Sequence, residues 1–238
     1  TAIRNGFVYA GTASEHRRRL HGRMPNEIPG WRFVVAAQNH DQVGNRAVGD
    51  RLGHQVSIER LRVAAALVLT SPFVPLLFQG EEWGATTPFQ YFTSHEEPTI
   101  AEQVRTGRRR EFPAFGWKPE DVPDPQDVET FRRSQLKWDE RQLPAHRALL
   151  DWYRALIALR RSTPDLRDGQ YQSAQVVYDE DAGWLVVSRG RILTACNVSD
   201  APRSVTVHRA CQLILASTLE VRIEGDAVVL PSDSIAIL

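Results

Sequence analysis

The sequence has no long hydrophobic run and no excess of charge. No stretch of 18 apolar residues occurs in the 238 residues, so the sequence predicts no membrane-spanning helix. The 29 basic residues balance the 29 acidic ones. A chain that is neutral overall is not drawn to nucleic acid or to an anionic membrane, so neither is expected as a partner. The arginine triplets at 17–19 and 108–110 are interpreted as solvated faces or as partners of carboxylates.

Cysteine is scarce, and the sequence carries no targeting segment that we can identify. Cys196 and Cys211 lie in a region of short apolar runs, where they could face each other. Two buried thiols in a cytosolic protein are the interpretation we favour, and a disulfide stays open. The sequence starts at Thr1, without an initiator methionine or the charged-then-apolar pattern of a secretion signal. We therefore expect the interior of a longer, cytoplasmic protein.

A strand–helix–strand pattern occupies the first third of the chain. Phe33–Ala37 and Val74–Phe78 are short, continuous apolar runs, which are typical of buried strands. Apolar residues recur between them at helical spacing, after a possible N-cap at Ser57 and before Pro72. This order predicts a βαβ unit with parallel strands. Polar residues follow each strand, at the end where parallel barrels place their chemistry.

The second half of the sequence changes from a helical to a strand pattern. A loop-rich stretch over 84–143, with a helix near Thr99–Arg105, leads to an amphipathic helix that ends at Pro164. From Gln175 onward, short apolar runs alternate with turn residues, which predicts an antiparallel β-sandwich. The runs expected to form strands are 176–178, 184–187, 192–196, 205–207, 212–215, 228–230 and 235–238.

Two parallel strands cannot close a barrel. Residues 1–165 would leave an open, apolar edge unless another segment covers it. We therefore expect residues 1–165 to form the C-terminal part of a (β/α)8 TIM barrel with long loops. Residues 166–238 are expected to form a small antiparallel β-sandwich domain. The fold class is α/β followed by all-β, and the missing N-terminal barrel segment becomes an expected partner.

The densest group of polar residues follows the first strand, in Gln38-Asn39-His40-Asp41-Gln42-Val43-Gly44-Asn45-Arg46. An amide, an imidazole and a carboxylate that emerge together can bind vicinal sugar hydroxyls or stabilise a developing cation. A His–Asp pair can also be only a structural hydrogen bond, which is the alternative reading. The spacing of His40, Asp41 and His54 does not resemble a metal site, so no metal and no cofactor are expected.

This segment resembles the strand-7 motif of the α-amylase superfamily, glycoside hydrolase family 13. The resemblance continues through an ordered set of segments at 75–84, 87–95, 107–112 and 122–127. Together they span roughly two-fifths of the chain, and residues 166–238 match only as a terminal β domain. Within the superfamily the set is most similar to enzymes that release trehalose.

The resemblance implies a retaining hydrolase that cleaves the α-1,4-glucosidic bond next to the terminal trehalose of a malto-oligosaccharide. The implied catalytic residue is Asp41, which would bind hydroxyls of the sugar being cleaved and favour its distorted ring. The implied substrate-binding residues are Gln38, Asn39, His40, Arg46, Gln90 and Tyr91. For Arg46 the implied role is to orient a carboxylate.

Such enzymes need a nucleophile and a general acid about 5–5.5 Å apart. By resemblance, both belong to earlier barrel strands, so this chain alone is expected to be inactive. Glu81 and Glu82 follow the second strand, where relatives shape the site, and we assign them no proton-transfer role.

Two other functions stay open at this point. One is another α-glucan hydrolase or transferase of the same superfamily, such as a branching enzyme, and the other is a non-catalytic fragment that contacts carbohydrate. Aromatic side chains can stack on the C–H faces of sugar rings, and they pack equally well inside loops. The residues concerned are Phe89, Tyr91, Phe92, Phe115 and Trp117.

Overall fold

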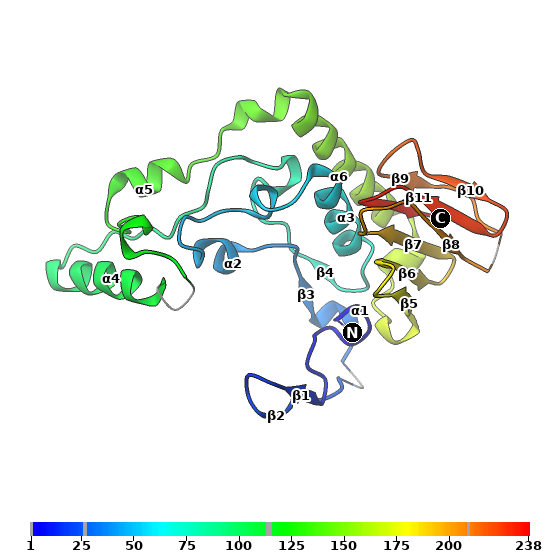
Figure 1. Cartoon of the computed structure of the whole chain (residues 1–238), viewed down its shortest axis with the longest axis horizontal. Coiled ribbons are helices and arrows are strands. Elements are labelled where there is room, and N and C mark those ends of the chain that lie inside the picture. The colour runs from blue at the N-terminus through cyan, green and yellow to red at the C-terminus, as the bar shows by residue number, and fades with distance from the viewer. Residues whose placement is uncertain (1, 26–27, 113–115, 209) are drawn as a thin grey trace. The chain divides into compact units, whose positions relative to one another are not determined.

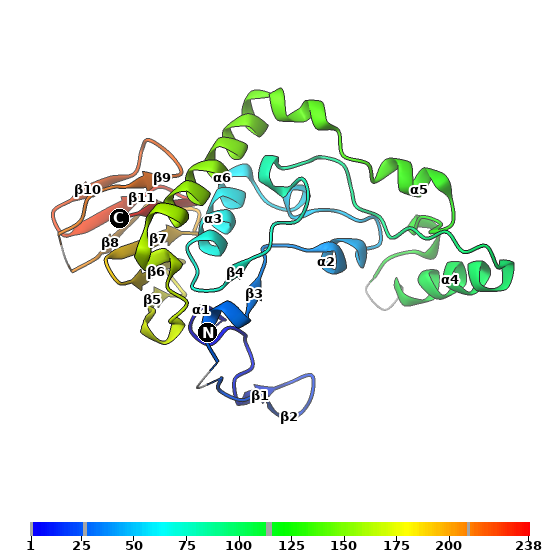
Figure 2. The same cartoon turned by 180° about the vertical axis from the view of Figure 1, so that it is seen from behind.

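A computed structural model describes residues 2–25, 28–112, 116–208 and 210–238 (Figures 1 and 2). The chain divides into two units. Unit 1 comprises Thr1–Ala36, Glu59–Leu76 and Asp151–Leu238, and unit 2 comprises Ala37–Ile58 and Leu77–Leu150. Of the aromatic residues considered above, Phe115 lies outside the described residues.

Unit 1 contains the strand pair expected from the βαβ pattern. Strand β3 (Val34–Val35) pairs in parallel with β4 (Val74–Pro75), which confirms the orientation of the two strands. Each strand has two residues, whereas the sequence predicted five. Val34 is 63% exposed and Val74 is 40% exposed. The pair therefore presents the apolar surface expected of strands without neighbours.

Helix α3 (Ile58–Leu69) connects these two strands and ends where the sequence predicted. Its buried face carries Val63, Ala66 and Leu69, so the small side chains let it pack closely. Two hydroxyls add hydrogen bonds to carbonyl groups at its C-terminus that also accept backbone N–H groups. Thr70 Oγ1 donates to the Ala66 carbonyl at 2.8 Å, and Ser71 Oγ donates to the Val68 carbonyl at 2.8 Å.

Residues 1–30 are rich in glycine, proline, arginine and histidine, a composition that predicts a long loop, and this prediction is wrong. This region contains helix α1 (Ala2–Asn5) and an antiparallel hairpin of β1 (Thr12–Ser14) and β2 (Arg19–His21), drawn in blue in Figure 1. These strands have three residues each and are mostly exposed. Strands that short carry no alternation of apolar and polar residues, so the pattern gave no signal.

The C-terminal part of unit 1 consists of two antiparallel sheets. The larger has the order β5-β6-β7-β12-β9, with bounds Gln175–Asp179, Trp184–Arg189, Ile192–Asn197, Ser234–Ile237 and Leu215–Ala216. The smaller has the order β10-β11-β8, with bounds Arg222–Glu224, Ala227–Leu230 and Arg203–Thr206. One apolar core joins Leu193 and Ala236 of the larger sheet to Val205 and Val228 of the smaller.

All seven runs expected as strands overlap a strand. The run at 212–215 does so only at Leu215, because Leu213 and Ile214 are exposed and bury no apolar face. Strand β10 was not predicted. Its three residues alternate polar, apolar, polar, and a pattern that short cannot be told from a loop.

The remaining helices are short except for two. They are α2 (His40–Gly44), α4 (Pro98–Glu111), α5 (Val128–Arg133), α6 (Pro144–Ser162) and α7 (Pro164–Arg167). The described part of the chain also contains six 3-10 turns: η1 (Gly30–Arg32), η2 (Leu52–His54), η3 (Glu81–Trp83), η5 (Pro119–Asp121), η6 (Trp138–Gln142) and η7 (Tyr171–Ser173). Pro164 ends α6 as predicted and also starts α7, since proline suits the first helical position. Within the described ranges, every helix is too short or too polar to cross a bilayer.

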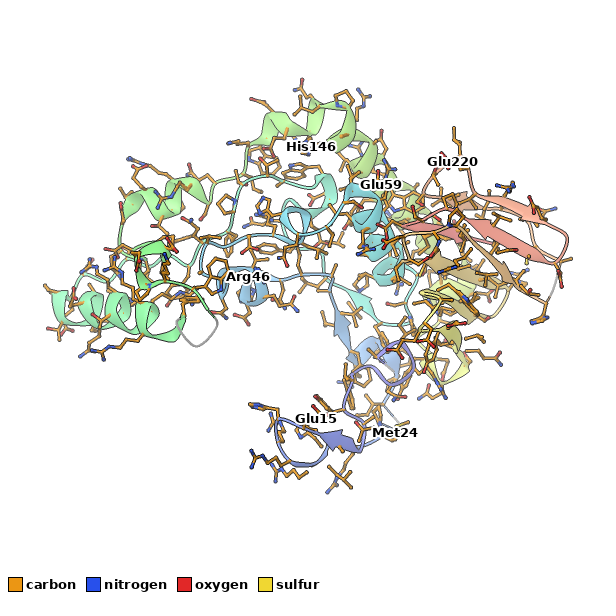
Figure 3. All side chains as sticks on the ribbon, in the orientation of Figure 1. Glu15, Met24, Arg46, Glu59, His146 and Glu220 are labelled. Atoms are coloured by element: carbon orange, nitrogen blue, oxygen red, sulfur yellow. The ribbon has the colours of Figure 1, made fainter. Side chains whose placement is uncertain are left out.

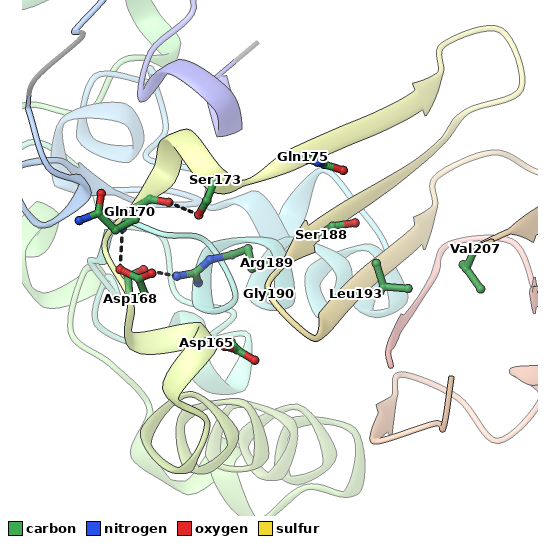
Figure 4. Close-up of a pocket in the computed structure, with 10 residues that line it drawn as sticks. All are labelled: Asp165, Asp168, Gln170, Ser173, Gln175, Ser188, Arg189, Gly190, Leu193 and Val207. Carbon is green, nitrogen blue, oxygen red and sulfur yellow. Dashed lines mark hydrogen bonds between the residues drawn. The ribbon is translucent and has the colours of Figure 1, made fainter. Parts of the chain in front are cut away.

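A buried arginine organises the cavity that Figure 4 shows in unit 1, which has a volume of about 530 Å³. Arg189 is 5% exposed, and its guanidinium group donates to four backbone carbonyl groups. Nη1 reaches Thr70 at 2.8 Å, Ser71 at 2.9 Å and Leu166 at 3.3 Å, and Nη2 donates to Asp168. Burial, with a contribution from the nearby Arg160, lowers the pKa of Arg189 to about 10. Arg189 therefore joins the end of α3 to α7.

Within the described residues Cys196 and Cys211 form no disulfide; Cys196 is buried as expected, whereas Cys211 is only half-buried. Burial raises the pKa of Cys196 to about 12. At pH 8 the native thiolate fraction is then about a thousandfold below that of the unfolded chain, whose pKa is 9.0. We expect native Cys196 to react at least that much more slowly with a thiol reagent, as measured by absorbance in a Cys211→Ser variant. Equal rates with and without denaturant would contradict this.

The raised pKa of Cys196 makes the free energy of unfolding depend on pH. Between pH 9 and 12 the native state keeps the Cys196 proton that the unfolded state loses. The contribution of this thiol to the free energy of unfolding is therefore full below pH 9 and falls as the pH rises through that window.

Candidate functional site

The Gln38–Arg46 segment lies at the start of unit 2 and contains the capped helix α2. Asn39 has an extended backbone, and its side chain accepts a hydrogen bond from the Gln42 N–H at 2.8 Å. It is therefore the N-cap of α2, which satisfies one of the N–H groups that a helix leaves unpaired. The cap fixes His40 and Asp41 in the first turn, where the helix dipole favours a carboxylate.

The His40–Asp41 pair lies at the surface. Nε2 of His40 is 3.4 Å from Oδ1 of Asp41, and the two side chains are 71% and 74% exposed. A surface pair at that distance adds little to stability, so the fold does not depend on these side chains. Both are accessible for binding a ligand, and their role in substrate binding stays a prediction.

Arg46, labelled in Figure 3, pairs with the carboxylate of Asp50 one turn further along the chain. Nε lies 2.7 Å from Oδ1, and the Asp50 side chain is only 17% exposed. Among the contacts of the described residues, the carboxylate that Arg46 orients is thus Asp50. The pairing fixes the loop after α2. The substrate-binding role predicted for Arg46 stays a prediction.

The segments that follow the two parallel strands meet at Arg51 and Leu52. Gln38, which follows β3, accepts a hydrogen bond from the Leu52 N–H at 3.0 Å. Arg51 is 1% exposed and donates from Nη1 to the carbonyl of Gln79, which follows β4, at 2.7 Å. Its Nε donates to the Thr87 carbonyl at 2.6 Å. The buried Gln38 thus acts within the protein, as a support for the loop that carries Arg51.

Acidic residues offset the cost of burying Arg51. Burial lowers the pKa of Arg51, and the charges of Glu82, Glu81 and Glu140 oppose that shift. The guanidinium group also stacks on Phe78, with its carbon 5.0 Å from the ring centroid. The charges of Glu81 and Glu82 therefore favour the charged form of a buried arginine.

A chain of hydrogen bonds extends from Arg51 to Glu140. Nδ1 of His54 accepts from the Arg51 N–H at 3.0 Å, so Nε2 carries the proton and donates to the Thr86 carbonyl at 2.9 Å. The Thr86 N–H donates to Glu140 at 3.1 Å, and its hydroxyl donates to the other carboxylate oxygen. Burial by itself would raise the pKa of Glu140, but these bonds from Thr86 lower it overall. His54 is therefore a structural residue here.

Gln90 is buried and fully engaged within unit 2. Its N–H donates to Ser134 Oγ at 2.9 Å, and its side-chain oxygen accepts from Arg133 at 3.2 Å. Its side-chain nitrogen lies 3.4 Å from the Val48 carbonyl. Tyr91, the next residue, is 40% exposed. Of these two predicted substrate contacts, Tyr91 has the more accessible side chain.

Arg108 is buried, so a solvated face, one of the two expectations for its triplet, does not hold at this residue. It donates from Nη1 to Asn45 Oδ1 at 3.0 Å and from Nη2 to the Gly44 carbonyl. Its guanidinium carbon lies 4.6 Å from the ring centroid of Tyr91. Arg108 thereby ties α4 to the end of α2 and orients Tyr91. Sequence reasoning missed it, because only burial distinguishes Arg108 from its neighbours in the triplet.

We expect Arg51→Lys to lower the free energy of unfolding by about 2–3 kcal/mol. A lysine ammonium group cannot reproduce the fork that serves the Thr87 and Gln79 carbonyl groups. Urea unfolding of the protein measures the loss, and Arg109→Lys, at an exposed position of α4, is the matched control. Equal unfolding midpoints for the two variants would contradict the role given to Arg51.

The described residues contain no group of three His, Cys, Asp or Glu side chains arranged to hold a metal ion. The candidate site consists of an exposed His–Asp pair on a short helix, whose end is bonded by the buried Arg108. Hydrogen-bonding groups of this kind suit a neutral, hydroxyl-rich ligand.

No protein-family model matches the chain, but curated relatives and a solved structure do. A malto-oligosyltrehalose trehalohydrolase from Rhizobium sp. (strain M-11) is 47% identical over 238 residues, which cover 99% of this chain and 40% of that protein. A namesake from Mycobacterium tuberculosis (strain H37Rv) is 45% identical over 216 residues, which cover 90% of this chain and 37% of that protein.

A solved structure gives the same result for the fold. The crystal structure of a protein described as a putative α-amylase from Salmonella typhimurium superposes with a TM-score of 0.84 at 34% identity. The match covers 99% of this chain and 40% of that one. The chain thus spans about two-fifths of the length of the relatives it matches. Over nearly its whole length, it is homologous to the C-terminal portion of the malto-oligosyltrehalose trehalohydrolases, glycoside hydrolases of the α-amylase family.

Proposed function

We propose that the complete protein containing this chain hydrolyses the α-1,4-glucosidic bond next to the terminal trehalose of maltooligosyltrehalose and releases trehalose. The observation that carries the proposal is the exposed His40–Asp41 pair, fixed by the Asn39 cap. The names of the relatives, at 45–47% identity, supply the substrate. The neutral, hydroxyl-rich substrate suits the donors and acceptors of the pair.

In this proposal Asp41 accepts hydrogen bonds from hydroxyls of the sugar being cleaved and favours the distorted ring of the transition state. His40 donates to the same sugar, and Tyr91 and Arg46 line its approach. Asn39, Gln38 and Gln90 act indirectly, because their side chains are engaged by the protein. The nucleophile and the general acid are assigned to the part of the protein that precedes this chain, about 5–5.5 Å apart in a retaining enzyme.

The proposed architecture follows from the same resemblance. Residues 1–165 form the last part of a (β/α)8 barrel, and residues 166–238 form a β-sandwich. The parallel β3–β4 pair and its exposed apolar side chains support the first assignment. The apolar core shared by two antiparallel sheets supports the second.

The experiment is to incubate the complete protein with maltooligosyltrehalose and to quantify trehalose by chromatography. A parallel reaction with amylose detects chain transfer or branching. We expect trehalose from the first substrate and no new branch points from the second. Branching without trehalose would replace the proposal with a transferase of the same superfamily.

The 238-residue chain by itself provides a second arm. We expect no trehalose from it, because the proposal places two essential carboxylates elsewhere. Turnover by this chain alone would show that it contains a complete catalytic set and would overturn the assignment of roles.

A further inference from the structure

Unit 2 contains a groove of about 460 Å³ that the site described above does not include. We call it the aromatic groove, and its principal side chains are Phe89, Phe92, Phe131, Trp138, Gln79 and Gln135. Phe92, Phe131 and Trp138 are 36%, 43% and 55% exposed. Large aromatic side chains gathered at that exposure are typical of a surface that contacts a ligand or another part of the protein.

The aromatic rings are held in place by their neighbours. The ring of Phe92 meets Phe131 edge-on at 5.2 Å and Phe89 edge-on at 5.9 Å. Trp138 lies 5.3 Å from Trp83, and the guanidinium carbon of Arg141 lies 4.9 Å from the Trp138 ring. Rings fixed in this way lose little conformational entropy when a ligand stacks on them.

Hydrogen bonds also fix the backbone that carries these rings. The N–H of Thr93, next to Phe92, donates to the Pro125 carbonyl at 2.7 Å. Thr130 Oγ1, next to Phe131, donates to the Asp124 carbonyl at 2.7 Å. Both sides of the groove are thus tied to the segment at 124–125 before any ligand arrives.

The chemistry of the groove selects a neutral ligand with apolar faces and polar edges. None of its lining residues, all of them in the described part of the chain, has an ionisable side chain. Aromatic faces pack against the C–H faces of a sugar, and the amides of Gln79 and Gln135 can donate to and accept from its hydroxyls. The volume lies within the ordinary range for small-ligand sites, about 300–1,000 Å³.

The groove adjoins the candidate site through Phe89. A Cβ placed on Gly44, in α2, would lie 3.8 Å from the Phe89 ring, and the Phe89 N–H donates to the Gly49 carbonyl at 2.8 Å. The same side chain thus borders α2, which carries His40 and Asp41, and lines the groove.

We propose that the aromatic groove is a glucan-binding subsite, in which Trp138 and Phe131 stack on glucosyl units of a malto-oligosaccharide chain. The choice of an α-glucan rests on the proposed function. The choice of a neutral sugar rests on the groove itself.

Hydroxyl-radical footprinting of the complete protein, with a millisecond pulse, tests the proposal without requiring turnover. We expect Trp138 and Phe131 to be oxidised without sugar and protected at least about threefold by maltoheptaose. Tyr178 of β5, which is 60% exposed, is the internal control and should be oxidised equally in both samples. Protection of neither residue by the sugar would overturn the proposal.

Absence of oxidation before sugar is added would also overturn it, because another part of the protein would then cover the groove. Protection of Trp138 in a protein that releases no trehalose would leave the groove as a glucan site and remove the proposed function. The two inferences can therefore fail separately.

Kinetics supply a second test. We expect Trp138→Ala to raise KM for long maltooligosyltrehaloses about tenfold, with kcat unchanged, and to leave KM for the shortest substrate as it was. Trp138→Phe, which keeps a ring, should recover most of the loss, and Tyr178→Ala should have no effect. A general folding defect would change KM at every chain length, and an increase independent of length would contradict the subsite.

Discussion

Replacing Asp41 by asparagine in the complete protein is expected to lower kcat about a hundredfold or more, which is a barrier increase of about 3 kcal/mol. Asparagine keeps the shape of the side chain and loses the negative charge that the proposed role requires near a developing cation. The thermal midpoint should stay the same, because the Asp41 side chain is 74% exposed and its ion pair with His40, at 3.4 Å, lies at the surface. Initial rates of trehalose release and a thermal melt measure the two quantities.

The matched control is Asp121→Asn, which removes the same charge from another exposed carboxylate of unit 2. We expect this variant to keep the parent kcat. Near-parental turnover by Asp41→Asn would remove Asp41 from the catalytic set. A fall in both kcat and the thermal midpoint would instead assign Asp41 a role in the fold.

Replacing Arg189 by methionine is expected to lower the free energy of unfolding by about 3–5 kcal/mol. Methionine fills similar space but donates no hydrogen bonds, so the carbonyl groups of Thr70, Ser71, Leu166 and Asp168 lose their shared donor. The Ser71 carbonyl keeps Nη1 of Arg160 as a donor at 2.7 Å, but a carbonyl group left without a partner in a buried setting carries the full cost of desolvation. The removal of a buried charge offsets part of this cost, which keeps the expected value below the sum of four bonds.

Urea unfolding of the protein measures this loss. Arg191→Met is the control, because it lies two residues away and its side chain is 85% exposed in a surface pair with Asp165. We expect little change for the control. Similar unfolding midpoints for the two variants would show that the carbonyl groups find other partners and that Arg189 does not hold α7 to the end of α3.

The candidate site was found from the sequence only in part. His40 and Asp41 were identified because the motif around them resembles that of a known superfamily, and α2 and its cap give them a physical setting. The motif also named Gln38 and Gln90, but it could not show that both side chains are engaged by the protein. The supports Arg51 and Arg108 were missed, because arginine in a polar loop or in a basic triplet usually faces water.

The sequence by itself determined the elements whose signal is local. The periodicity between Ser57 and Pro72 set the bounds of α3, and continuous apolar runs identified the parallel β3–β4 pair and most C-terminal strands. Tertiary structure alone decided which charged residues are buried. Arg51 bonds a carbonyl 36 residues away, and Arg189 bonds one 119 residues away. No local pattern encodes such a partner, since a guanidinium group is buried only where folding brings enough acceptors around it.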